Sequence, residues 1–163
     1  LDLRAQAGAI NNARQLEQNL TMVQTAQTEG GTLYHGGARL HKDTGGYFMQ
    51  PTIITGVAPE HSLAQREVFG PVLAVTAFDT EAEAIQMANA TDYGLAGGVW
   101  TSDLSRAHRV TRDLRTGVVH VNTYGGPDVT VPLGGVKQSG NGHDKSLHAF
   151  AKYLDLKTAW IKL

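Results

Sequence analysis

The sequence predicts an α/β fold built around a parallel sheet. From residue 72 onward, five segments follow one another in the order strand, helix, strand, helix, strand within about fifty residues. This order gives parallel strands joined by right-handed crossovers. The chain has 163 residues, of which 41% are hydrophobic and 18% charged, values typical of a globular domain with its own core. Its 19 glycines against 5 prolines indicate many tight turns. Short elements around one core are therefore expected.

The first element is predicted to be a helix over residues 11–28. Apolar residues recur there mostly at spacings of three and four, and the pair Gly30-Gly31 marks the end of the helix. The members of this stripe are Ala13, Leu16, Leu20, Val23 and Ala26. Strands over 32–34 and 48–54, separated by a glycine-punctuated loop, then predict a small hairpin.

The next three elements alternate in type. Residues 72–78 form an apolar strand, and the capping-box sequence Thr80-Glu-Ala-Glu83 begins a helix that runs through Ala90. Residues 95–100 are predicted to form the following strand. This segment therefore predicts one strand–helix–strand unit.

The remaining elements continue that alternation. Ser102 or Asp103 caps a second helix that ends at Leu114, and residues 117–121 form a further strand. A short helix over 145–152 and a terminal strand over 156–163 are expected after a glycine-rich loop. If the parallel strands belong to a larger sheet, sequence outside this chain covers one edge of it.

Charge and composition exclude several classes of function. Lys plus Arg number 14 and Asp plus Glu number 15, so no broad field favours nucleic acid or membrane surfaces as partners. No stretch approaches the ~20 apolar residues that span a bilayer. The start Leu1-Asp-Leu-Arg4 also lacks the pattern of a secretory signal, so a cytoplasmic location is expected.

The chain contains no cysteine and seven scattered histidines. The absence of cysteine excludes disulfides, thiolate zinc sites and a cysteine nucleophile, and the histidines lack metal-ligand spacing, so no metal site is expected. Gly134-Gly135 and the glycines at 140 and 142 do not have the spacing of a phosphate-binding P-loop. Tight turns explain them better.

Several motifs, taken in order, resemble the NAD(P)-dependent aldehyde dehydrogenases. They include Glu67-Val-Phe-Gly-Pro-Val72, Tyr93-Gly-Leu-Ala96 and Pro132-Leu-Gly-Gly-Val-Lys-Gln-Ser-Gly140. Their spacing is similar to the C-terminal third of such an enzyme over nearly the whole chain. The segment from Thr130 to Gly142 most resembles the branch that acts on γ-glutamylamino- or guanidino-butyraldehydes.

This resemblance implies a fold and a domain division. The fold is the parallel-sheet catalytic domain of the aldehyde dehydrogenase fold, truncated at its N-terminal side. Residues 1–154 would be a partial catalytic domain, and residues 155–163 a C-terminal strand for homo-oligomerisation. An ordinary edge strand packed on its own domain is the alternative for the last segment.

The resemblance also implies an activity for the parent enzyme. In the family a cysteine thiolate attacks the aldehyde, hydride passes to NAD or NADP, and a glutamate-activated water releases the carboxylic acid. The cysteine, that glutamate and the phosphate-binding glycines would all lie upstream, so we expect this chain alone to be inactive. The resemblance leaves open whether this chain alone binds the cofactor. The alternative function is a non-catalytic interaction module that oligomerises through its C-terminal strand.

Two residues match cofactor contacts of the family. Glu67 matches the glutamate that accepts hydrogen bonds from the nicotinamide-ribose hydroxyls, and Phe69 matches the aromatic residue beside the nicotinamide. A solvated turn residue is the alternative for Glu67, and a buried core aromatic is the alternative for Phe69.

A substrate site for the small-molecule aldehyde is expected after the strand that ends at residue 121. In open α/β sheets, ligands bind at this end of the strands. Asp128 could receive a cationic or amide-bearing substrate tail, or it could simply cap local N–H groups. The candidate substrate-binding residues are Asn122, Thr123, Gly125, Pro127, Asp128 and Leu133.

Overall fold

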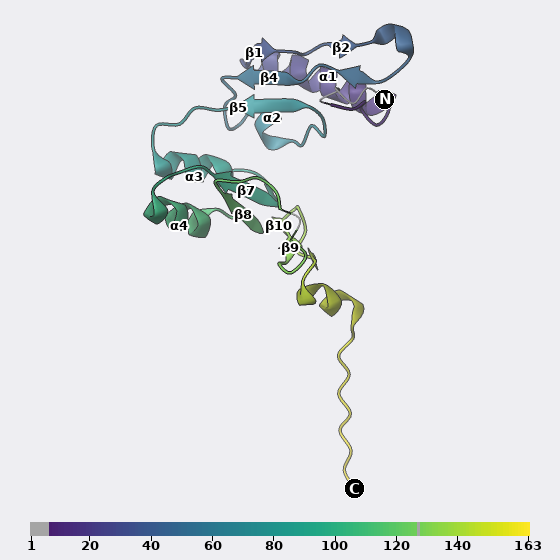
Figure 1. Cartoon of the computed structure of the whole chain (residues 1–163), viewed down its shortest axis with the longest axis vertical. Coiled ribbons are helices and arrows are strands. Elements are labelled where there is room, and N and C mark those ends of the chain that lie inside the picture. The colour runs from purple at the N-terminus through teal and green to yellow at the C-terminus, as the bar shows by residue number, and fades with distance from the viewer. Residues whose placement is uncertain (1–6, 127) are drawn as a thin grey trace. The chain divides into compact units, whose positions relative to one another are not determined.

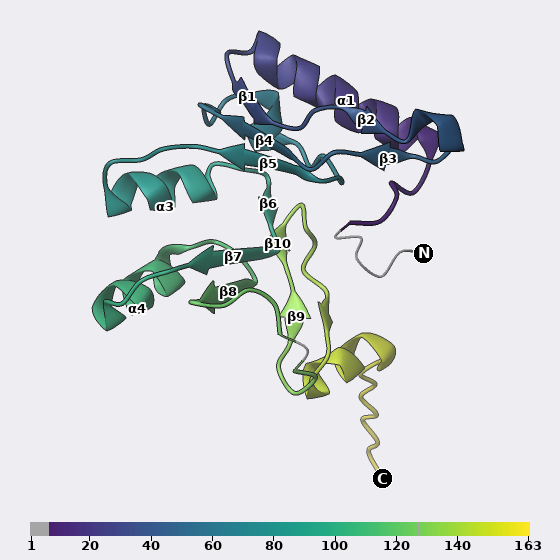
Figure 2. The same cartoon turned by 45° about the horizontal axis from the view of Figure 1, so that its top comes forward.

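The computed structural model describes residues 7–126 and 128–163. The chain divides into two compact units, unit 1 with residues Leu1–Asp79 and unit 2 with residues Thr80–Leu163. Figures 1 and 2 show the elements of each unit from two directions. Each unit is described separately below.

Unit 1 begins with a long helix, α1 (Ala13–Thr28). The side chain of Asn12 accepts a hydrogen bond from the Gln15 backbone nitrogen at 2.8 Å and so caps the first turn. After the helix, Gly30 adopts a φ of +107°, a conformation that glycine reaches without strain. The predicted helix and its glycine end are confirmed.

Unit 1 also contains a three-stranded sheet. It consists of β1 (Thr32–His35), β4 (Thr52–Thr55) and β5 (Val72–Val75), in the order β1-β4-β5. β1 and β4 are antiparallel, whereas β4 and β5 are parallel. The antiparallel pairing agrees with the predicted hairpin.

Shorter elements complete unit 1. β2 (Arg39–Leu40) and β3 (Phe48–Met49) pair on either side of the 3₁₀ turn η1 (Lys42–Thr44), and α2 (Ser62–Gln65) is a single turn. Side chains from α1, the sheet and α2 form one buried apolar cluster. Its buried members are Leu16, Val23, Ala26, Met49, Ile54, Val57 and Leu63.

Unit 2 contains two capped helices and a pair of parallel strands. α3 (Glu81–Asn89) starts after Thr80, and α4 (Leu104–Asp113) starts after Asp103; each cap side chain accepts a backbone N–H bond of its helix. β7 (Ala96–Val99) and β8 (Val118–Val121) pair in parallel. These helices and strands confirm the predicted α/β pattern.

The predicted run of three successive parallel strands needs a correction. β5 pairs with β4 in unit 1, in the register Thr52 opposite Val72, while β7 and β8 form a separate two-stranded sheet. Local periodicity determines where strands form, but long-range hydrogen bonding determines which strands become neighbours. β5 also ends at Val75, three residues earlier than predicted.

Two small antiparallel pairs follow in unit 2. β6 (Tyr93–Gly94) pairs with β10 (Val136–Lys137), and β9 (Leu133–Gly134) pairs with β11 (His143–Asp144). The helix predicted over 145–152 is a 3₁₀ helix, η2 (Leu147–Tyr153). The Ser146 side chain caps it by accepting a bond from the His148 nitrogen.

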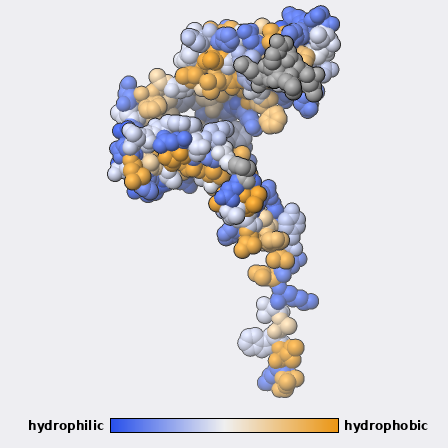
Figure 3. Space-filling model, viewed as in Figure 1, coloured by the Kyte–Doolittle hydropathy of each residue, from blue (hydrophilic) through white to orange (hydrophobic). Residues whose placement is uncertain are grey.

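Residues 154–163 contain no helix or strand, so the predicted terminal strand does not form within this chain (Figure 1). A strand needs a pairing partner, and no described segment pairs with these residues. The extended tail carries both apolar and charged residues (Figure 3), and Trp160 is 93% exposed. Pairing of this tail with another chain stays a prediction.

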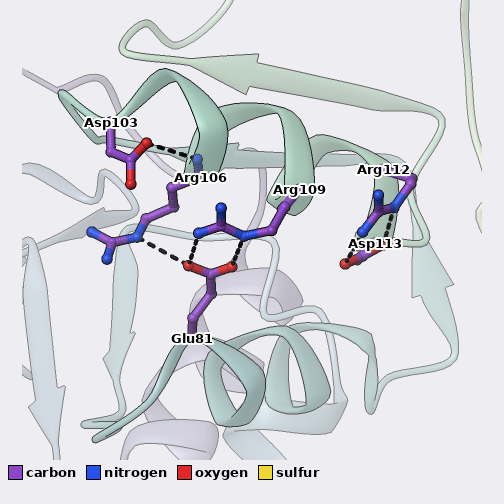
Figure 4. A network of polar contacts seen from close by, with 6 residues as sticks. All are labelled: Glu81, Asp103, Arg106, Arg109, Arg112 and Asp113. Carbon is purple, nitrogen blue, oxygen red and sulfur yellow. Dashed lines mark hydrogen bonds and ion pairs between the residues drawn. The ribbon is translucent and has the colours of Figure 1, made fainter.

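A polar network joins α3 to α4 (Figure 4). Arg109 donates to both carboxylate oxygens of Glu81 at 2.8 and 2.9 Å, and Arg106 donates to one of them at 3.0 Å. The Arg109 hydrogen bonds, followed by that of Arg106, lower the pKa of Glu81 to about 2.

Within the part of the chain that the structure describes, no helix has the length and apolar character needed to span a bilayer.

Candidate functional site

The first candidate site lies on the loop between α2 and β5, residues 66–71, here called the Glu67 loop. Two backbone bonds fix its C-terminal end: the Gly70 oxygen accepts from the Val72 nitrogen, and the Pro71 oxygen accepts from the Thr52 nitrogen, both at 2.8 Å. Thr52 is only 2% exposed and belongs to the central strand β4. The loop is therefore anchored to the sheet immediately beyond its functional candidates.

Phe69 has an unusual backbone and an exposed ring. Its φ is +55°, in the left-handed region that costs a bulky residue about 1–3 kcal/mol, and its side chain is 73% exposed. The alternative of a buried core aromatic is therefore wrong for this chain. Strain of this kind is found most often at functional sites, where a side chain must be presented.

Glu67 and Phe69 share one pocket of about 520 Å³ between α1 and the Glu67 loop. Both residues are exposed, and within residues 7–126 and 128–163 the Glu67 carboxylate has no hydrogen-bond partner. The pocket thus combines a carboxylate that can accept two hydroxyl donors, an aromatic face and two guanidinium groups. Its remaining lining residues are Arg14, Gln15, Glu17, Gln18, Thr21, Met22, Thr25, Ser62, Arg66 and Val68.

Two residues beside this site, Gln15 and Asn19 on α1, were not predicted from the sequence. The Gln15 side-chain amide lies 2.8 Å from the Val68 carbonyl oxygen, and Asn19 is fully buried beside it. The predicted apolar stripe included Ala13 and Leu20, which are exposed and half-buried, whereas Asn19 occupies the buried face. The available signal was an amide pair at positions i and i+4 within an otherwise apolar stripe.

The second candidate site follows β8 in unit 2, and its first residue is Asn122. Asn122 has a φ of +54°; its side-chain nitrogen donates to the Thr101 oxygen at 2.9 Å, and its side-chain oxygen accepts from the Thr101 nitrogen at 2.8 Å. The amide therefore bonds both backbone groups of one residue. These contacts assign Asn122 a role in fixing where the following loop leaves the sheet.

The loop after Asn122 is exposed over its described residues, including Thr123 and Gly125. One oxygen of Asp128, Oδ1, accepts from the Thr130 nitrogen at 2.8 Å and from the Thr130 hydroxyl at 2.7 Å. These bonds, with a smaller contribution from the charge of Lys145, lower the pKa of Asp128. Asp128 thus caps local groups, the simpler of its two interpretations, and uses a single carboxylate oxygen to do so.

Of the other two candidate substrate-binding residues, the structure describes Leu133 but not Pro127. Leu133 lies in β9 opposite Asp144 and is 40% exposed. Pro127 lies outside the described residues. No group of three or more metal-ligating side chains occurs among the residues that the structure describes.

The chain belongs to the aldehyde dehydrogenase family, whose model matches residues 1–159. This match confirms the family that the Glu67–Val72 and Pro132–Gly140 motifs indicated, and with it the expected fold class. The chain spans about a third or less of the length of the curated relatives it matches.

Three relatives illustrate the similarity. The NADP/NAD-dependent aldehyde dehydrogenase PuuC of Escherichia coli K12 is 58% identical over 113 residues, 69% of this chain and 23% of PuuC. A betaine aldehyde dehydrogenase of Rhizobium etli is 43% identical over 162 residues, 99% of this chain and 33% of that enzyme. The crystal structure of an indole-3-acetaldehyde dehydrogenase with NAD⁺ matches with a TM-score of 0.95 at 51% identity, covering 99% of this chain and 33% of that one.

Proposed function

We propose that this chain supplies the nicotinamide-side cofactor contacts and part of the aldehyde site of an NAD(P)-dependent aldehyde dehydrogenase. The observation that carries the proposal is the shared pocket of Glu67 and Phe69, in which Phe69 is held exposed by a strained backbone. In ligand pockets, an exposed aromatic face and a few polar groups commonly contact the bound molecule. Because the chain belongs to the aldehyde dehydrogenase family, we propose that this ligand is the dinucleotide NAD or NADP.

The residues present fit the nicotinamide half of NAD or NADP. The two carboxylate oxygens of Glu67 match two adjacent ribose hydroxyl donors, and the Phe69 ring offers an apolar face to a flat heterocycle. When bound, the cofactor accepts hydride from the substrate. The chain holds no cysteine to attack the aldehyde, so we propose that it does not oxidise aldehydes alone.

The loop after β8 forms the substrate side of the proposal. Thr123, Gly125, Pro127 and Leu133 would line the aldehyde path, with Asn122 holding the start of the loop. Asp128 has an oxygen, Oδ2, that neither of its Thr130 bonds uses, and this oxygen would receive a cationic or amide-bearing tail. The resemblance of residues 130–142 to the γ-glutamylamino- and guanidino-butyraldehyde branch supports a substrate of that type, and the similarity to a betaine aldehyde dehydrogenase supports a cationic tail.

The proposal includes assembly and location. Residues 155–163 expose Leu156, Trp160 and Ile161 and would add a strand to a sheet of a second copy, which gives a homo-oligomer in the cytoplasm. This tail also supports the second candidate function, a non-catalytic module that acts only through oligomerisation. Light scattering of the chain at micromolar concentration tests both, because a strictly monomeric species contradicts assembly through the tail.

Calorimetric titration with NAD tests the cofactor site directly. We expect the chain to bind NAD and Glu67→Gln to weaken binding about tenfold, because one charge-assisted bond to a ribose hydroxyl is lost. Glu60→Gln is the control, since Glu60 is exposed in unit 1 and outside the pocket lining. Equal affinity of Glu67→Gln and the unchanged chain contradicts the assignment, and aldehyde-dependent NADH formation by the chain contradicts the proposed inactivity.

A further inference from the structure

We infer that Asn19 is a positioning residue, which holds the Glu67 loop through the Val68 carbonyl so that Glu67 and Phe69 face the pocket. The inference rests on the proposed function of that pocket as a cofactor site. It assigns a role to a residue of α1 that is distant in sequence from the loop.

The burial of Asn19 requires hydrogen-bond partners. Its side chain is 0% exposed on the α1 face that also carries Leu16 and Val23, both part of the apolar cluster. A buried amide without partners is strongly unfavourable, whereas an apolar residue of similar size at this position would extend the cluster. Asn19 is therefore explained by the groups it bonds.

Three polar groups meet at this point, and we call them the amide triangle: the Gln15 side chain, the Asn19 side chain and the Val68 carbonyl oxygen. The Gln15 side-chain amide lies 2.8 Å from the Val68 oxygen and 2.8 Å from the Asn19 amide, and the Asn19 amide lies 2.8 Å from the Val68 oxygen. Two amide nitrogens do not face each other at that distance, so one amide presents its oxygen to the other. The Val68 oxygen accepts from at least one of them.

The Asn19 amide is assigned by its partners. With its nitrogen toward Val68, that nitrogen donates to the Val68 oxygen at 2.8 Å and to the Gln15 backbone oxygen at 3.1 Å, and the Gln15 side-chain amide turns its oxygen toward the Asn19 nitrogen. This orientation satisfies the buried donor twice. It also connects the loop to the helix backbone as well as to a helix side chain.

Holding the Val68 carbonyl controls the conformation of Phe69. That carbonyl belongs to the peptide plane between Val68 and Phe69, and the φ of Phe69 is the rotation about the bond next to this plane. Phe69 has a φ of +55°, and in an unrestrained loop this residue would favour a negative φ. The amide triangle fixes one side of this rotation, and the bonds from Val72 and Thr52 fix the chain after it.

Gly70 gives independent support. A Cβ on Gly70 would overlap the Asn19 amide, although the φ of Gly70 lies outside the positive region that requires glycine. The need for glycine therefore comes from the approach of Asn19 and not from the backbone angle. Loop and helix side chain fit each other at this contact.

Hydrogen exchange of the intact chain, followed by mass spectrometry, tests the inference without any ligand. Asn19→Leu keeps most of the side-chain volume and removes every hydrogen bond of the amide. We expect peptides covering residues 66–72, in which the Arg66 and Val72 amides donate to the Ser62 and Gly70 oxygens, to exchange at least tenfold faster at those two amides, while peptides of β1 and β4 change little. Gly70→Ala should loosen the same peptides, because its Cβ displaces the Asn19 amide, and it serves as the second variant if Asn19→Leu does not fold.

Val23→Ala is the matched control, because Val23 is 2% exposed on the same helix and its side chain has no polar group that could bond the amide triangle. It should weaken all of unit 1 without selective loosening of the Glu67 loop. Unchanged exchange of the Arg66 and Val72 amides in Asn19→Leu or in Gly70→Ala overturns the inference, and so does equal loosening in Val23→Ala.

Titration with NAD separates this inference from the proposed function. If the unchanged chain binds NAD, Asn19→Leu should lower its affinity about tenfold while Val23→Ala leaves the affinity unchanged. Equal NAD affinity of Asn19→Leu and the unchanged chain overturns the positioning role. If the unchanged chain binds no NAD, the cofactor site fails by itself, and the exchange measurement alone decides whether Asn19 holds the loop.

Discussion

Different interactions stabilise the interior of unit 1 and the interior of unit 2. Unit 1 has a continuous apolar cluster in which Ile54 and Ala26 are 0% exposed. In the described residues of unit 2, the buried hydrophobic residues are Ala107 and Val110 alone, both on α4. Unit 1 therefore follows the ordinary rule that burial of apolar area dominates stability, and unit 2 does not.

Unit 2 relies on polar side chains that bond backbone groups at the ends of its elements. Asn89 donates to the Asp113 oxygen at 2.9 Å and accepts from the Arg115 nitrogen at 2.8 Å, which fixes the end of α4 to the end of α3. Lys137 donates to the Asn89 and Thr91 oxygens at 2.8 and 2.9 Å. These directional contacts define geometry well but add less free energy than a filled core.

The largest expected effect comes from removing core volume in unit 1. Ile54→Ala should lower the free energy of unfolding of unit 1 by about 2–5 kcal/mol, because it leaves a cavity in the apolar cluster. Leu73→Ala on the neighbouring strand is the control, since Leu73 is 57% exposed, and its effect should stay within about 0.5 kcal/mol. Hydrogen exchange of α1 and β4 measures both, and equal effects contradict the assignment of the core.

A smaller effect is expected from removing one polar clamp in unit 2. Asn89→Ala should destabilise the α3–α4 region by about 1–3 kcal/mol, because the Asp113 oxygen and the Arg115 nitrogen both lose their partner. Asn89→Asp keeps the acceptor for Arg115, so its stability should lie between those of Asn89→Ala and the unchanged chain. Exchange of the Arg115 amide reports the change directly, with Gln86→Ala on the exposed face of α3 as the control.

If Asn89→Ala leaves the Arg115 amide as protected as in the unchanged chain, apolar contacts and not the clamp hold unit 2. The contrast between the units would then be one of degree. If Asn89→Ala opens unit 2 while unit 1 stays protected, the two units have independent sources of stability.

The same contrast explains which features could be predicted from the sequence. The helices at Thr80 and Asp103 were predictable because a cap and an apolar period are local signals, whereas the cofactor role of Glu67 and Phe69, suggested by an intact motif, stays a prediction. The pairing of β5 with β4 was not predictable from periodicity, because a strand segment contains no information on which distant edge bonds it. Asn19 was missed because the amide pair at positions 15 and 19 does not indicate which carbonyl it meets, here one that lies 49 positions after Asn19 in the chain.

The smallest effect, and the one that best sharpens the contrast, is the response of unit 2 to acid. Glu81 has its pKa lowered from 4.5 to about 2 by its bonds to Arg109 and Arg106. A carboxylate with a depressed pKa in the folded state stabilises that state fully above pH 4.5, and the contribution is lost as the pH falls toward 2. Glu81 is 29% exposed, so solvent screens the pair and the effect stays modest.

Glu81→Gln removes the group that titrates between these two pH values. We therefore expect the thermal midpoint of unit 2, followed by amide protection of α3 and α4, to fall less steeply with acid in Glu81→Gln than in the unchanged chain. Unit 1 should show the same acid response in both proteins, which makes it an internal control. Identical acid profiles for α3 and α4 in the two proteins contradict the network of Figure 4 as a source of stability, and unit 2 would then depend on its asparagine and lysine clamps.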